Sequence, residues 1–110
     1  MIKHGADLRG IQPEMAIAYT IVAHIYWNTH GAVCTITEGT GGVHMVDSKH
    51  GEGKALDIRV HNIPTNEWNA LLMDIKTALG PQFDVILEHT PPHFHVEFDP
   101  KDKPKEGTPV

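Results

Sequence analysis

The sequence predicts an α+β domain in which helices pack on one face of a small antiparallel sheet and leave the other face to polar side chains. Two helical patterns and four strand-like segments follow one another in the order helix, strand, strand, helix, strand, strand. The last two strand-like segments are joined by a short, hairpin-like connection. This order, together with the hairpin, favours a single antiparallel sheet.

A single domain is expected, because 110 residues match the usual size of one domain and can bury a core without disulfide bonds. Residues 1–100 should form this domain, and residues 101–110, which are charged and rich in proline, should form a flexible C-terminal tail. The one cysteine, Cys34, cannot form an internal disulfide, and its apolar neighbours predict that it is buried. The net charge of −5 argues against nucleic-acid binding, which needs a basic surface.

The helices are predicted from apolar spacing and from the residues at their ends. The first covers residues 13–28, because Pro13 suits a first helical turn and a glycine follows the segment. Four branched side chains recur along it at helical spacing and should face the core: Ile17, Ile21, Val22 and Ile25. The second helix covers residues 65–79, with Thr65 as the expected cap and a glycine again as the stop.

Four strands are predicted where short runs of β-branched and aromatic residues lie between turn signals: residues 32–37, 55–60, 83–88 and 94–98. The hairpin-like connection between the last two should cover residues 89–92. Residues 39–53, which are rich in glycine and polar side chains, should form a long irregular loop. Loops of this length in a small domain are usually functional or disordered.

Polar residues interrupt two of these strands in an alternating pattern. In the second strand, Asp57 lies between Leu56 and Ile58, and in the fourth strand His93 and His95 alternate with apolar residues. Successive side chains of a strand point to opposite faces of the sheet. If the two strands lie close together, Asp57 and His95 therefore share the face that looks away from the core.

Histidine is unusually frequent, with nine residues against nine Lys and Arg combined, and it is the commonest metal ligand in proteins. Two histidines and one carboxylate are a common ligand set for catalytic zinc, which makes a nucleophile of its bound water near pH 7. Asp57 and His95 would supply two ligands, and His50 on the glycine-rich loop could close over them. Each motif alone is often only a polar strand face or a turn residue, but together they indicate a metal site opposite the helices.

Two segments carry a resemblance to a known family. SKHGEGKALDIR, which begins at Ser48, resembles the S-x-H-x-x-G-x-A-x-D motif of the zinc peptidases related to D-Ala-D-Ala carboxypeptidase, and PHFHVEFDP resembles their C-terminal H-x-H motif. This group of peptidoglycan peptidases includes phage L-alanyl-D-glutamate endopeptidases. The resemblance spans roughly residues 11–100. It implies that His50, Asp57 and His95 bind zinc and that Ser48 orients His50 through the loop.

This resemblance does not identify the residue that carries the proton. Many members have an acid three residues before the last ligand, where this chain has Pro92, so Glu88 and His93 are the candidates for the base. His93 resembles a histidine that assists catalysis in some members, and the EHTPPHFH connection before the last ligand is longer than the turn usual in phage members. Many members also carry an arginine that steadies the substrate. Three residues could supply that charge here: His44, Lys49 and Arg59.

The predicted function is that of a zinc-dependent peptidoglycan peptidase, endolysin-like or D-Ala-D-Ala carboxypeptidase-like, that hydrolyses a peptide bond of the cell-wall stem peptide. The alternative, suggested by Pro92, is a non-catalytic zinc-binding structural or virion module. We expect a monomer that has no nucleic-acid partner and no membrane span. The segment MIKHGADLRG has no apolar signal core, which fits an enzyme that is cytoplasmic until released, or virion-associated.

Overall fold

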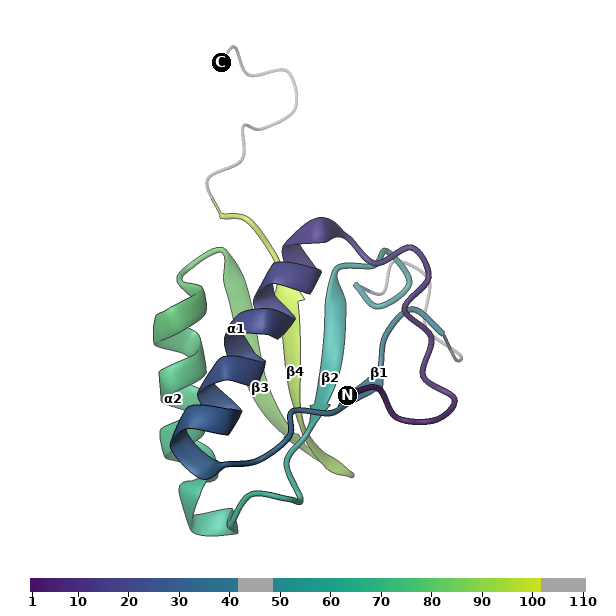
Figure 1. The fold of residues 1–110 in the computed structure, drawn as a ribbon. Helices are drawn as coiled ribbons and strands as arrows, with labels where there is room; N and C mark the ends of the chain where they lie inside the picture. Colours follow the sequence, from purple (N-terminus) through teal and green to yellow (C-terminus); the bar gives the residue numbers. More distant parts are fainter. Residues whose placement is uncertain (42–48, 102–110) are drawn as a thin grey trace.

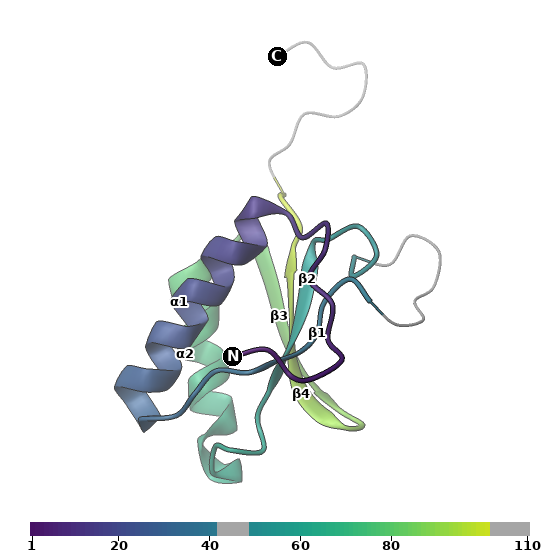
Figure 2. The ribbon, with the colours of Figure 1, turned by 45° about the vertical axis from the view of Figure 1, so that its right-hand side comes forward.

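Two helices lie on one face of a four-stranded antiparallel sheet in the computed structural model, which describes residues 1–41 and 49–101 (Figure 1). The elements are α1 (Pro13–His30), β1 (Ile36–Glu38), β2 (Ala55–Arg59), the 3-10 turn η1 (Thr65–Glu67), α2 (Trp68–Leu79), β3 (Phe83–His89) and β4 (Pro92–Phe98). The strand order is β1-β2-β4-β3, and each neighbouring pair is antiparallel. The turned view in Figure 2 again places α1 and α2 on the same side of the sheet, so the predicted α+β class is confirmed.

Helix α1 has the predicted start, but it buries a different stripe from the one expected. Its core-facing residues follow the i, i+3, i+4 spacing of one helix face: Met15, Ala18, Val22 and Tyr26. Val22 was predicted correctly, whereas Ile17 is 62% exposed because it lies across the helix from that stripe. Gly31 ends the helix in a left-handed conformation with φ 59°, as a glycine stop is expected to do.

Helix α2 begins later than predicted, because the first turn of the segment is a 3-10 turn. Thr65 opens η1 and is not the cap of α2, and neither η1 nor α2 has a side-chain cap hydrogen bond. The indole N–H of Trp68 donates to the carbonyls of Val60 and Ile63, at 3.0 and 2.9 Å. These bonds tie the start of α2 to the end of β2, and Gly80 stops the helix as predicted.

The first strand is shorter than predicted and lies further along the chain. Residues 32–35 are outside β1. The carbonyl of Val33 accepts from the Asn62 side chain, and that of Cys34 accepts from the hydroxyl of Tyr19, so neither is available to a neighbouring strand. The β3–β4 hairpin is tighter than predicted. His89 pairs with Pro92, so only two residues connect the strands, whereas residues 89–92 were predicted to form the connection.

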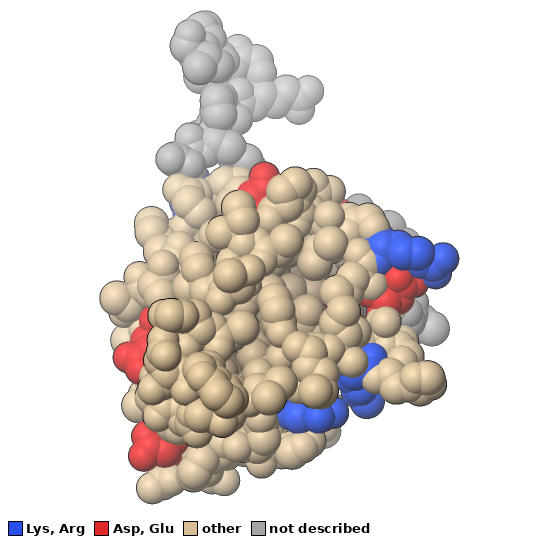
Figure 3. All heavy atoms as spheres, in the orientation of Figure 1, with Lys and Arg blue, Asp and Glu red and all other residues tan. Residues whose placement is uncertain are grey.

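The core lies between the helices and the sheet. It is formed by apolar side chains from both helices and from all four strands, and Cys34 is buried in it as predicted. The face that carries α1 shows charged side chains mainly at its rim (Figure 3), and Glu14 is the one Asp, Glu, Lys or Arg residue within α1. Among the described residues, no helix has both the length and the apolar character that crossing a membrane requires.

Candidate metal centre

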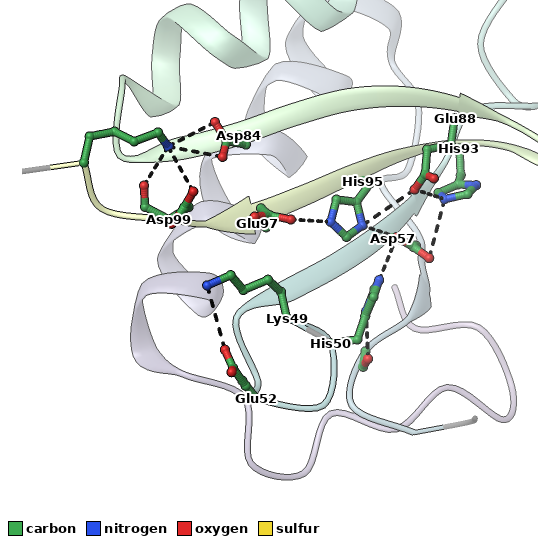
Figure 4. Close-up of polar contacts among 12 residues, drawn as sticks. Lys49, His50, Glu52, Asp57, Asp84, Glu88, His93, His95, Glu97 and Asp99 are labelled. Carbon is green, nitrogen blue, oxygen red and sulfur yellow. Dashed lines mark hydrogen bonds and ion pairs between the residues drawn. The ribbon is translucent and has the colours of Figure 1, made fainter. Parts of the chain in front are cut away.

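The register between β2 and β4 brings the predicted ligands together. Asp57 pairs directly with His95, and Arg59 pairs with His93. Because Leu56 and its apolar neighbours on these strands are buried beneath the helices, the alternating polar side chains project from the opposite face. Figure 4 shows the histidines and carboxylates gathered on this face.

Three potential ligand atoms converge at the carboxylate of Asp57. Its Oδ1 lies 3.1 Å from Nε2 of His50 and 3.1 Å from Nδ1 of His95. Tetrahedral ligands held about 2.0–2.1 Å from zinc are separated from one another by about 3.3 Å, so this spacing fits a zinc ion. Asp57 and His50 are buried, and His95 is half-buried. The donor set of two imidazoles and one carboxylate could therefore hold a metal ion, and its chemistry is compatible with zinc.

Both histidine ligands are oriented by an acceptor on the far side of the ring. Nδ1 of His50 is 2.9 Å from the carbonyl of Gly39, and Nε2 of His95 is 2.9 Å from Oε1 of Glu97. When these nitrogens donate, the other nitrogen of each ring is left to bind a metal. Glu97 is a functional candidate that the sequence analysis missed. Its signal was its position two residues after His95, on the same face of the same strand.

The loop that carries His50 is held by two close backbone contacts. Gly53 has φ +75°, and a Cβ at this residue would lie 2.2 Å from the carbonyl oxygen of Gly10. A Cβ on Gly39 would likewise lie 2.4 Å from the carbonyl oxygen of Asp7. The glycine of the S-x-H-x-x-G segment therefore allows the close backbone approach that positions His50 over the sheet.

The cluster is strongly coupled electrostatically. The hydrogen bond to Asp57 raises the pKa of His95 to about 9, with Glu97 adding to the effect. Burial lowers the pKa of His50, but the hydrogen bond and charge of Asp57 outweigh burial and leave that pKa above its ordinary value. Burial raises the pKa of Asp57, yet the two histidines hold it well below its usual range. A cation that binds here must displace any proton that either ring carries on its Asp57-facing nitrogen.

The two candidates for the proton carrier contact each other at the edge of the cluster. Glu88 pairs with His93 across the hairpin, and Oε1 of Glu88 lies 3.2 Å from Nε2 of His93. The same carboxylate oxygen is 3.7 Å from Nδ1 of His95. Pro92 itself is exposed at the hairpin end. A carboxylate is thus supplied to the site by the neighbouring strand.

Arg59 lies on the polar face beside this pair. It lines a cavity of about 210 Å³ together with His93, Lys3 and Thr37. Two cationic side chains at one small cavity suit an anionic group of a ligand. Ser48, predicted to orient His50, and His44, a candidate for contacting the substrate, lie outside the described residues.

No protein-family model matches the chain, and no curated protein is similar enough to count as a match. What the site does must therefore be inferred from its own chemistry. The described residues bring together three side chains that could hold a metal ion and a histidine–carboxylate pair that can carry a proton. A small cavity lined by Arg59 and Lys3 lies beside His93.

Proposed function

We propose that this protein is a zinc-dependent peptidase that hydrolyses a peptide bond in the stem peptide of peptidoglycan. The observation that carries the proposal is the convergence of His50, Asp57 and His95 at ligand spacing, beside the contact between Glu88 and His93. The S-x-H-x-x-G-x-A-x-D and H-x-H motifs support the choice of substrate class. We further propose that the protein acts on the cell wall as a monomer, after release from the cytoplasm or from a virion.

Within this proposal, zinc at this site would supply an acidified water and would polarise the carbonyl oxygen of the scissile peptide. His50, Asp57 and His95 hold the ion, and Glu97 keeps His95 in the tautomer that binds it. The pair formed by His93 and Glu88 takes a proton at Nε2 or Oε1 and delivers it to the amine that leaves. The three proposed ligands meet at Asp57, and Nε2 of His93, in the proposed proton carrier, lies 3.5 Å from Oδ2 of that carboxylate.

The cationic cavity supports a substrate with a free carboxylate near the scissile bond. Both substrate types implied by the resemblance have one, the terminal carboxylate of D-Ala-D-Ala or the free α-carboxylate of the γ-linked D-glutamate. Arg59 and Lys3 line the cavity, and His93 connects it to the cluster. A carboxylate placed there would orient the peptide relative to the proton carrier.

The test is digestion of purified peptidoglycan by the full chain, with product masses and new amino termini as the readout. Zinc-loaded protein should release stem-peptide fragments, and chelator should abolish the release. His50→Ala and His95→Ala should lose bound zinc and hydrolysis together, whereas His89→Ala, an exposed histidine of the same hairpin, should lose neither.

One result would favour the alternative of a non-catalytic zinc-binding module, which is motivated by Pro92 at the position where many members carry an acid. In that result, the wild-type chain holds one equivalent of zinc through these ligands and releases no product from peptidoglycan. Absence of zinc binding would reject both the peptidase and the module.

A further inference from the structure

A second group of ligand atoms surrounds the other oxygen of Asp57. Whereas Oδ1 faces His50 and His95, Oδ2 lies 3.5 Å from Nε2 of His93. Nε2 of His93 is in turn 3.2 Å from Oε1 of Glu88. Asp57, Glu88 and His93 each bring one ligand atom into a cluster in which all three atoms lie within 4.8 Å of one another. The two clusters share a single carboxylate and use different oxygens of it.

The ring of His93 is oriented in the same way as the ring of His50. Nδ1 of His93 is 2.7 Å from the carbonyl of Pro91, just as Nδ1 of His50 faces the carbonyl of Gly39. With Nδ1 donating, Nε2 of the neutral ring directs its lone pair at the carboxylates of Asp57 and Glu88. A metal cation placed between these three groups could accept an electron pair from each of them.

We infer that the protein binds a second divalent cation through Asp57 Oδ2, Glu88 and His93, with Asp57 as the carboxylate that bridges the two ions. Two-metal hydrolytic sites place their ions about 3.5–4 Å apart, a distance that one carboxylate can span. Imidazole with two carboxylates suits zinc, cobalt or manganese.

The second site is the weaker of the two. Glu88 is 46% exposed at its side chain, so it loses conformational freedom when it binds a cation, while the ligands of the first site are already held by Gly39 and Glu97. The first cation should therefore bind to His50, Asp57 and His95, and the second should follow at higher concentration.

A consequence for activity rests on the proposed function. A cation between Glu88 and His93 displaces the proton that this pair would carry. Zinc beyond one equivalent should therefore inhibit hydrolysis, and the inhibition should follow occupancy of the second site. Cation binding itself does not depend on the protein being a peptidase.

The experiment titrates the chelator-treated full chain with Co²⁺, with calorimetry and the visible absorption of bound cobalt as readouts. The wild-type chain should bind two equivalents, the second more weakly. Glu88→Gln should weaken the second by at least about tenfold and leave the first unchanged. His93→Ala should do the same, with circular dichroism confirming that the variant is folded. His89→Ala and Glu67→Gln, which change exposed residues that are not among the ligands, are the matched controls.

A single equivalent in the wild-type chain would overturn the inference, as would a second equivalent that survives in both Glu88→Gln and His93→Ala. Loss of the second equivalent in the control variants would also overturn it, because the cation would then be bound elsewhere on the surface. Two equivalents without hydrolysis of peptidoglycan would keep this inference and reject the proposed function. Hydrolysis of peptidoglycan by a protein that binds only one equivalent of cation would reject this inference and keep the proposed function.

Discussion

A rise in pH should lower the stability of the metal-free protein and increase the stabilisation that zinc provides. In the metal-free protein, the pKa of His95 is raised to about 9 from an ordinary value of 6.5. A raised pKa contributes stability that is fully present below pH 6.5 and is lost as the pH rises toward 9. The pKa of Asp57 is depressed, so its contribution is present above about pH 4 and is lost in acid. The metal-free protein should thus be most stable between about pH 4 and 6.5.

The size of the effect follows from the raised pKa of His95. The full difference of about 2.5 pH units would correspond to about 3.4 kcal/mol, and screening by the solvent that reaches the ring reduces this to roughly 1–2 kcal/mol. For a domain of about this size, that loss lowers the melting temperature by roughly 5–15 °C between pH 6.5 and 9. Zinc must displace the ring protons, so the stabilisation that zinc provides grows over the same interval.

Thermal unfolding at pH 6.5 and pH 9, with chelator and with zinc, tests this prediction. His95→Gln should remove most of the pH dependence in chelator, and His61→Ala, an exposed histidine outside the cluster, should keep it. A melting temperature in chelator that is constant or rises from pH 6.5 to 9 would refute the electrostatic reasoning. So would a full pH dependence in His95→Gln.

Four further predictions concern single residues. Glu97→Gln should lower zinc affinity about 10- to 100-fold in a competition assay, because it removes the charge that orients the last ligand; unchanged affinity would contradict this. Glu88→Gln should retain the first zinc while turnover falls about 100- to 10,000-fold, and wild-type turnover would exclude it as proton carrier. Gly53→Ala should lower the free energy of chemical unfolding by about 2–4 kcal/mol, because the added Cβ would lie 2.2 Å from a backbone oxygen. Gly31→Ala, which has open space around the added Cβ, should lower it by about 1–2 kcal/mol. Equal losses in the two variants would argue against the close contact at Gly53. Arg59→Gln should raise KM more than it lowers kcat for substrates with a free carboxylate, and should leave substrates without one unaffected.

Local patterns were sufficient for the class of fold and for the sheet face on which the candidate ligands Asp57 and His95 lie. The period-2 alternation around Asp57 and His95 predicts, from the local sequence alone, which side chains face the core and which face away from it. Glycines that follow the helices marked both stops correctly. The same local reasoning was wrong about Ile17, because several rotations of α1 satisfy its apolar spacing and only packing against the sheet selects one.

Distances across the sheet were decided by tertiary structure alone. The residue types and strand faces of Asp57 and His95 follow from the sequence, but they lie 38 residues apart, and their 3.1 Å contact depends on the register of β2 with β4. The register of the hairpin likewise sets Glu88 opposite His93 and supplies a carboxylate where the chain has Pro92. A shift of one residue would send each of these side chains to the other face. Register results from pairing and burial summed over the whole sheet, and therefore no single motif contains it.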